Sequence, residues 1–330
     1  MDFEPTDDQL TLQAELRGFL GDRVTPEARR AIGQLPGAVD RDLWRGLGDM
    51  GVFALTLPEV DGGVGLGLAE ATLVFEELGR AAVPGPLIGT FLAAGLGAEI
   101  SAGAATGEAV VGLTPAGQPA LVEHAAALDA LLVVAGDGVS ITARPTGSRP
   151  VDRPLDPLTP VDVVDALPAG RAVGGPEVAA RLRATGGLLA AALQVGLADA
   201  AVTLAAAYAK ERTQFGRVIG TFQALKHLLA DAQVGVEVAR ASVQAAGVEI
   251  DDEGGAIDAE ASGQARRAVD AARIVASRAA DRATRASIQV HGGMGFTWEL
   301  DAHLYLKRAL VLDVGIGSPD DAIESRAAAL

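Results

Sequence analysis

The chain contains no cysteine, and this absence excludes two classes of site. Its 330 residues include no cysteine and only four histidines. Without thiols, neither a disulfide framework nor a thiolate metal centre can form. The four histidines are scattered along the chain and do not have the spacing of metal ligands. The sequence therefore predicts no metal site.

Positive charge is also scarce. The chain has 27 Lys and Arg residues against 43 Asp and Glu residues, which gives a formal net charge of −16. A surface with this much negative charge repels phosphate backbones and anionic lipids. We therefore expect neither a nucleic acid nor a membrane as partner. The start of the chain carries Asp2 and Glu4 where a secretory signal needs basic residues, and we expect no membrane-spanning stretch. These features predict a cytoplasmic protein.

The chain does have enough apolar sequence for two or three packed units, because 49% of its residues are hydrophobic. Changes in composition divide it into three regions. Residues 1–107 are predicted to be helical, residues 108–172 to form a small, shortened β domain, and residues 173–330 to form a helical bundle. The expected fold class is mainly α with a small β domain.

Local patterns in the first region predict helices and one tight loop. Asp7 and Asp8 are placed to cap a first helix, and a further helix is expected to begin near Asp40. The glycine run at 62–67 predicts a tight loop before a helix over 68–78. A phosphate-binding loop is excluded because no Gly-Lys-Ser/Thr follows the run.

The other two regions differ clearly in pattern. Short apolar runs predict strands, and a hairpin is expected across Gly136-Asp137-Gly138. Alanine-rich segments then predict buried helices over 177–209, 222–248, 258–290 and 299–313. The acidic cluster at 251–255 is expected to be a solvated turn between two of them, since it lacks the ligand positions of a calcium-binding loop.

Two motifs in the third region carry a resemblance to a known family. Residues 211–227 read ERTQFGRVIGTFQALKH and residues 289–296 read QVHGGMGF. In this order they resemble the two flavin-contact segments of acyl-CoA dehydrogenases. The stretch from Trp44 to Gly51, with the LPE and GGVG runs that follow, is similar to the N-terminal domain of that family. The resemblance covers nearly the whole chain and implies the acyl-CoA dehydrogenase fold, with an N-terminal helical domain, a reduced β domain and a C-terminal four-helix bundle.

The resemblance implies FAD as cofactor. The planar, charged guanidinium group of Arg212 can donate paired hydrogen bonds to the pyrophosphate, and the amide of Gln214 can form hydrogen bonds beside it. Glycines at the second motif let backbone N–H groups approach the dinucleotide closely. The implied cofactor-binding residues are Arg212, Gln214, Phe215, Phe222, Gln223, Gln289, Gly292 and Gly293. From the residues alone, an alternative stays open, in which Arg212 pairs with Glu211 or another acid and the glycines only end a helix.

Two features that the family normally has are missing. The sheet region reads LTPAGQP at 113–119, without the Glu and Ser-Asp of the family's Thr-Glu-Pro-x-Ala-Gly-Ser-Asp loop, and no Trp precedes the strand at 139–142. Counting on from Lys307, the family's catalytic Glu position corresponds to Ile316, which cannot accept the acyl α-proton. No catalytic residue is therefore predicted in this chain. Asp199 and Asp313 are the remaining candidates for a displaced base.

These losses predict a degenerate subunit of a heteromeric enzyme. The resemblance then implies an α2β2 complex with a homologous acyl-CoA dehydrogenase subunit, which holds the flavin ring and the catalytic Glu. It also implies an acyl-CoA substrate and electron-transfer flavoprotein as the acceptor. Two alternatives stay open, namely a homo-oligomeric dehydrogenase that uses Asp199 or Asp313, and a scaffold without flavin.

Overall fold

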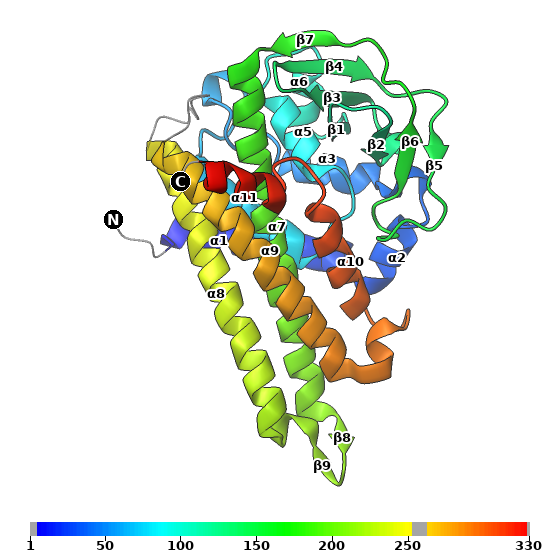
Figure 1. The fold of residues 1–330 in the computed structure, drawn as a ribbon, viewed down its shortest axis with the longest axis vertical. Helices are drawn as coiled ribbons and strands as arrows, with labels where there is room; N and C mark the ends of the chain where they lie inside the picture. Colours follow the sequence, from blue (N-terminus) through cyan, green and yellow to red (C-terminus); the bar gives the residue numbers. More distant parts are fainter. Residues whose placement is uncertain (1–4, 253–262, 329–330) are drawn as a thin grey trace.

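The computed structural model describes residues 5–252 and 263–328. Along the chain, a group of short helices is followed by a small sheet region and then by three long helices (Figure 1). In Figure 1 the long helices α7, α8 and α9 run side by side, and the sheet region lies beside one end of them. The predicted fold class, mainly α with a small β domain, is confirmed.

The described part of the N-terminal region, from residue 5 onward, is built from six α-helices and two short 3-10 helices. Their bounds are α1 Asp7–Arg23, α2 Pro26–Ile32, η1 Pro36–Ala38, α3 Arg41–Asp49, η2 Glu59–Asp61, α4 Leu68–Arg80, α5 Leu87–Ala94 and α6 Ser101–Ala105. The cap of α1 is Thr6 and not Asp7 or Asp8 as expected, because Thr6 and Gln9 form a reciprocal capping box. The two aspartates lie in the first turn, where negative charge favours the helix dipole. The helix expected near Asp40 is confirmed as α3, with Asp40 as its cap.

The sheet region consists of two small sheets. Its strands are β1 Val111–Pro115, β2 Ala120–Glu123, β3 Ala130–Val134, β4 Val139–Ala143, β5 Arg149–Pro150, β6 Val161–Val164 and β7 Arg171–Gly174, with η3 Ala125–Ala127 after β2. One sheet has the order β1-β3-β4-β7 and the other the order β2-β6-β5. Strand β1 is parallel to β3, whereas β3 and β4 form the predicted antiparallel hairpin. All five residues of β3 are buried, so this strand is the centre of the sheet region's core.

Outside residues 253–262 and 329–330, the C-terminal region contains the three long helices and two short α-helices. Its elements are α7 Pro176–Glu211, β8 Thr213–Gln214, β9 Arg217–Val218, η4 Ile219–Thr221, α8 Gln223–Asp252, α9 Gln264–His291, η5 Gly292–Phe296, α10 Ala302–Leu312 and α11 Pro319–Ala328. Helix α4 packs against α7 with backbones in contact. A Cβ at Gly79 would lie 2.1 Å from the carbonyl oxygen of Leu193, and one at Gly196 would lie 1.9 Å from that of Glu76. Only glycine fits at these two positions, and the close approach joins the N-terminal region to the bundle.

Helix α7 corrects the expectation that no stretch resembles a membrane span. By length and composition this helix is apolar enough to cross a membrane. However, 78% of its most apolar 18-residue window is buried inside the protein. This is the environment of a core helix surrounded by other helices.

The acidic cluster at 251–255 also differs from its prediction where the structure describes it. Helix α8 continues through Asp252, and residues 253–255 lie outside the described part of the chain. Asp251 accepts hydrogen bonds from the backbone N–H groups of Leu68 at 2.8 Å and Ala69 at 2.9 Å. Its carboxylate therefore caps α4, which begins 183 residues earlier in the sequence.

Candidate functional site

The two predicted flavin-contact segments meet at one end of the bundle. The first runs from the end of α7 through the β8–β9 hairpin to the start of α8, and the second covers the end of α9 and η5 (Figure 1). Ala205 and Ala209 of α7, Ile219 of η4 and Val290 of α9 form one small buried cluster. Segments about 75 residues apart in sequence are thus held together by apolar packing.

The side chains of the first segment point away from the chain's own core. Phe215 is 91% exposed at the tip of the hairpin and has a positive φ of 54°, an unfavourable backbone conformation for an aromatic residue. Arg212, Gln214 and Gln223 are exposed as well. Phe222 is half-buried, and the guanidinium carbon of Arg217 lies 4.0 Å from the centre of its ring.

Arg212 has an unpaired guanidinium in the part of the chain that the structure describes. Its backbone N–H ends α7 by donating to Tyr208 O, but its guanidinium makes no hydrogen bond or ion pair with any residue that the structure describes. The alternative in which Arg212 pairs with Glu211 is therefore not observed. An exposed, unpaired guanidinium is free to bind an anion from outside the chain, and a pyrophosphate is one such anion.

The glycine turn after α9 leaves open space around its backbone. Gly292 has a φ of 61°, which favours glycine, and a Cβ at Gly292 or Gly293 would meet no atom within 4 Å. Gln289, one turn earlier, is exposed. Next to the turn, His291 is buried, and its Nδ1 lies 2.7 Å from Ser287 O while its Nε2 has no partner among the described residues. Open backbone and an unpaired buried nitrogen fit a polar ligand such as the dinucleotide tail of a flavin.

A separate cavity lies between the helical regions and the sheets. It has a volume of about 530 Å³ and is bounded by the start of α5, the β1–β2 connection, one face of α7 and the segment from α10 to Ile316. This volume falls in the range of small-molecule sites. Most of its lining is apolar, and its titratable members are Glu123, His124, Asp156 and Arg308. These four residues come from three distant segments and form no local motif, so the sequence does not indicate them.

Residues 6–107 match the acyl-CoA dehydrogenase N-terminal domain, and residues 175–328 match the acyl-CoA dehydrogenase C-terminal domain. Acyl-CoA dehydrogenase IpdE2 of Mycobacterium tuberculosis is 35% identical over 311 residues, which cover 92% of this chain and 92% of the relative. The chain belongs to the acyl-CoA dehydrogenase family.

Solved structures of this family's fold agree with that assignment. A chain of the ChsE4-ChsE5 complex from Mycobacterium tuberculosis has a TM-score of 0.82 and 25% identity, covering 99% of this chain and 98% of that one. PigA, solved with FAD and proline, has a TM-score of 0.79 and 19% identity, covering 99% of this chain and 98% of its own, and shares the fold. These structures confirm the predicted acyl-CoA dehydrogenase fold, and membership of the acyl-CoA dehydrogenase family supports the predicted cofactor, FAD.

The position that the sequence predicts for the family's catalytic Glu is apolar here. Ile316 is buried in the segment between α10 and α11 and lines the 530 Å³ cavity. The residue of α7 that faces it is Gly186, whose added Cβ would lie 2.7 Å from Ile316 Cγ2. Neither of these two residues is an acid, so neither supplies a proton acceptor at the predicted base position.

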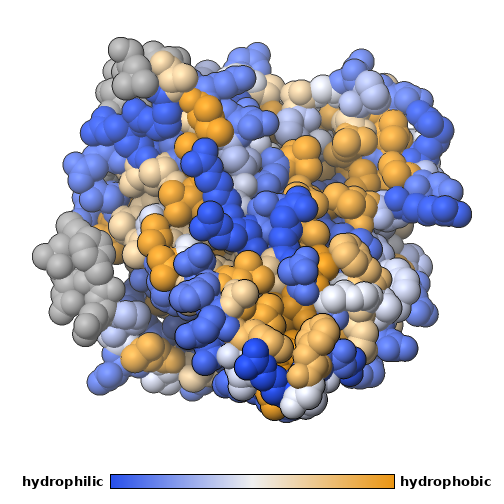
Figure 2. Space-filling view, turned by 60° about the horizontal axis from the view of Figure 1, so that its bottom comes forward, coloured by the Kyte–Doolittle hydropathy of each residue, from blue (hydrophilic) through white to orange (hydrophobic). Residues whose placement is uncertain are grey.

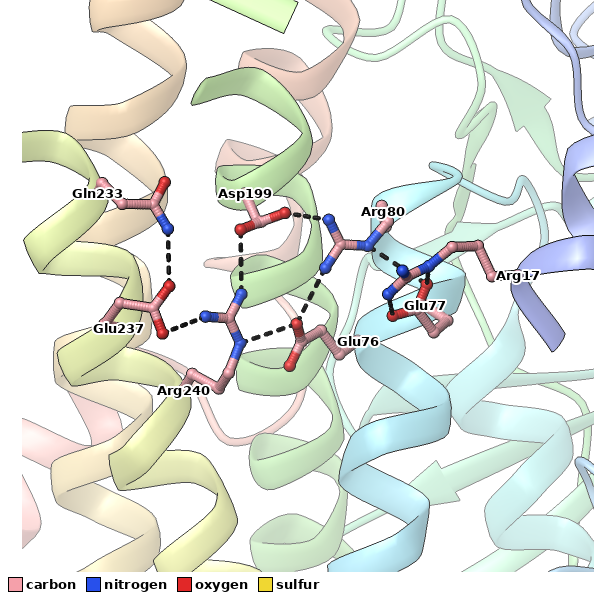
Figure 3. A network of polar contacts seen from close by, with 8 residues as sticks. All are labelled: Arg17, Glu76, Glu77, Arg80, Asp199, Gln233, Glu237 and Arg240. Carbon is pink, nitrogen blue, oxygen red and sulfur yellow. Dashed lines mark hydrogen bonds and ion pairs between the residues drawn. The ribbon is translucent and has the colours of Figure 1, made fainter. Parts of the chain in front are cut away.

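Asp199 belongs to an ion-pair network and does not line the cavity. In Figure 3 its carboxylate lies between the guanidinium groups of Arg80 and Arg240, which also bind Glu76. Arg17, Glu77, Glu237 and Gln233 extend the network, so that it joins α1, α4, α7 and α8. Burial alone would raise the pKa of Asp199, but the two guanidinium groups outweigh it and hold the pKa below its usual value. So strongly paired a carboxylate is a poor proton acceptor.

Asp313 is likewise engaged in packing between helices. Its carboxylate accepts hydrogen bonds from Gln194 at 2.7 Å and Ser277 at 3.0 Å, and it lies 3.5 Å from Arg273. These partners come from α7 and α9, so the carboxylate faces the bundle. Asp313 is absent from the lining of the 530 Å³ cavity. Neither candidate for a displaced base is positioned to serve that cavity.

Proposed function

We propose that this chain is one of two unlike subunits of an FAD-dependent acyl-CoA dehydrogenase. In this complex it contributes contacts to the dinucleotide tail of FAD, while a homologous partner holds the flavin ring and carries the catalytic Glu. The complex converts an acyl-CoA thioester to the 2,3-enoyl-CoA. One observation carries the proposal: Arg212 is exposed and unpaired among the described residues, yet Ile316 and Gly186 leave the base position without an acid.

Each residue of the flavin-contact segments has a part in this proposal. FAD, when bound, supplies the hydride acceptor for the desaturation. In this chain, Arg212 binds the pyrophosphate charge, and Gln214, Gln223 and Gln289 donate or accept hydrogen bonds beside it. Gly292 and Gly293 leave room for the dinucleotide to approach the backbone. Phe215 and Phe222 shield these polar contacts from water, which strengthens them.

A partner subunit also accounts for the apolar groups exposed at the same end of the bundle. Phe215, Met294, Phe296 and Trp298 are all exposed large hydrophobic residues of the two flavin-contact segments or of the residues next to them. Figure 2 brings this end of the molecule forward and shows apolar side chains gathered between hydrophilic ones. Exposed apolar groups of this kind are typical of interaction surfaces. The similar ChsE4-ChsE5 structure is itself a complex of two named proteins.

The test is to express the chain alone and together with a homologous acyl-CoA dehydrogenase encoded beside it. Flavin absorbance and acyl-CoA oxidation are measured for both preparations, with electron-transfer flavoprotein as acceptor. The proposal expects flavin and activity only in the joint preparation. Flavin and activity in the lone chain would support a homo-oligomeric dehydrogenase, and absence of flavin from both would support a scaffold. The acidic composition favours a cytoplasmic complex, which fractionation of the source cells would test.

A further inference from the structure

Glu123 lines the 530 Å³ cavity without a hydrogen bond or ion pair to any residue that the structure describes. It is the last residue of β2 and lines the cavity together with His124, Asp156 and Arg308. Within the described parts of the chain, its carboxylate forms no hydrogen bond and no ion pair. This distinguishes Glu123 from the other polar members of the lining.

Asp156 and Arg308, two of the other polar residues of the lining, already form hydrogen bonds and an ion pair within the chain. Asp156 accepts hydrogen bonds from Leu158 N at 2.9 Å and Thr159 Oγ1 at 2.7 Å, and it binds Arg308. Arg308 also donates to Val83 O at 3.2 Å and to Leu158 O at 3.1 Å. The Asp156–Arg308 pair thus neutralises its own charge and is held in place by backbone groups.

His124 does not complement Glu123 either. Its Nδ1 lies 2.5 Å from the carbonyl oxygen of Gly37. In the neutral ring, the Nδ1–H group donates a hydrogen bond to this oxygen. Burial lowers the pKa of His124 to about 4, so the ring carries no charge at neutral pH. Among the titratable residues of the lining, the only cation near Glu123 is therefore the guanidinium of Arg308, which is already paired with Asp156.

An unpaired carboxyl group at an apolar cavity is costly to the protein unless something binds it. Burial raises the pKa of Glu123 to about 7, and nearby Arg308 offsets this effect only in part. The group therefore changes protonation near neutral pH. Glu123 is half-buried and lines the cavity, and as a carboxylate it has acceptor sites that no described residue fills.

We propose that Glu123 determines which molecule the cavity accepts, namely a compact, mainly apolar compound that presents a hydroxyl group to the carboxylate. The apolar lining from α5, β1 and α7 binds the body of this compound, and its hydroxyl hydrogen is donated to Glu123. Ile316 gives the cavity wall an apolar side chain at the position expected for the family's catalytic Glu, so this chain binds the compound without removing a proton from it. The inference concerns the cavity and does not depend on the shared flavin site.

Two naphthalene derivatives of similar size test the inference directly. We would titrate the full-length chain with 2-naphthol, which has a hydroxyl donor, and with 2-methoxynaphthalene, which does not, and follow binding by the change in their fluorescence. At about pH 8, we expect 2-naphthol to bind roughly tenfold or more tighter than 2-methoxynaphthalene. A hydrogen bond to a charged acceptor contributes enough binding free energy for this difference in affinity. At about pH 5.5, where Glu123 is protonated, the preference should shrink to a few-fold.

Substitutions then assign the preference to Glu123. Glu123→Gln keeps the shape of the side chain but removes its charge, and we expect the preference to fall to a few-fold at both pH values. Glu15→Gln, at an exposed position on α1, should leave it unchanged. Ala190→Leu fills part of the cavity from α7 and should weaken both compounds equally, which locates the site. Equal affinity of the native chain for the two compounds, or an undiminished preference in Glu123→Gln, would overturn the inference.

Discussion

Gly186 on α7 and Ile316 in the segment before α11 fit against each other so closely that a Cβ at 186 would lie 2.7 Å from Ile316 Cγ2. Any larger residue at 186 would have to displace the isoleucine. Ile316 lines the cavity, and Gly186 packs against it, at the position that the sequence predicts for the family's proton acceptor. On that prediction, the loss of the base involves two packed residues from different elements and not one substitution alone.

This packing leads to a prediction for Ile316→Glu. The new carboxylate would enter an apolar wall, where desolvation raises its pKa and favours the protonated form. We expect no acyl-CoA oxidation by the lone variant and a loss of about 1–3 kcal/mol in the free energy of unfolding at neutral pH. Urea denaturation and a dehydrogenase assay check both outcomes, with Ile316→Leu as the control for packing. Robust oxidation by the partner-free Glu variant would show that this chain can hold the flavin ring after all.

Arg212→Ala should separate flavin retention from folding. Since the guanidinium has no partner among the described residues, its removal should leave the unfolding transition of the chain unchanged. A lost charge-assisted contact of about 1.5–3 kcal/mol weakens flavin binding by the complex by roughly tenfold or more. Flavin content after gel filtration of the complex measures the effect. Arg181→Ala, an exposed arginine near the other end of the same helix, is the matched control, and equal flavin loss in both variants would contradict the assignment.

The arrangement of regions and the place of the flavin-contact segments could be predicted from the sequence because both are encoded locally. Apolar periodicity determines where helices and strands form, and each motif is a continuous stretch with its own turn chemistry. Their meeting at one end of the bundle follows from the fold of the family. The hairpin at Gly136-Asp137-Gly138 is a purely local feature of the same kind.

The polar group of the cavity could not be predicted in this way. Glu123 is only the acidic end of a short apolar strand, and nothing nearby in the sequence indicates that Asp156 and Arg308 lie beside it. Asp251 looked like part of a solvated turn because its partners, Leu68 and Ala69, are more than 180 residues away. Contacts of this range depend on tertiary packing, which periodicity does not encode.

Asp199→Asn should reduce stability and leave catalysis intact. The change removes a carboxylate that two arginines share, although both retain Glu76 as a partner. We expect a loss of about 1–3 kcal/mol in the free energy of unfolding, since the pairs are partly buried. Turnover by the assembled complex, measured per bound flavin, should stay within a factor of about two, because the transition state loses no contact.

The control for this change is an exposed ion pair. Asp281→Asn breaks an i,i+4 pair with Arg285 on the surface of α9 and should cost no more than about 0.5 kcal/mol. Asp313→Asn should resemble Asp199→Asn in stability and in turnover, since its carboxylate also binds side chains of neighbouring helices. A fall of several orders of magnitude in kcat for either variant would identify that aspartate as the base.

Glu123→Gln should stabilise the chain in a pH-dependent way. The pKa of Glu123 is about 7 in the folded chain, above its ordinary value of 4.5, so the folded state keeps a proton that the unfolded state has released. The contribution of this group to the free energy of unfolding is therefore fully present at acidic pH and is lost as the pH rises from about 4.5 to about 7. Glutamine does not ionise and avoids this loss.

We therefore expect Glu123→Gln to unfold at higher urea concentration than the native chain at about pH 8, by about 1–3 kcal/mol, and to match it at about pH 4.5. Glu15→Gln, exposed on α1, should change stability at neither pH by more than about 0.5 kcal/mol. A stability difference that is the same at both pH values would mean that packing, not ionisation, distinguishes the two side chains. Saturating 2-naphthol should narrow the difference at the higher pH, because the ligand stabilises the ionised form of Glu123 in the folded native chain only.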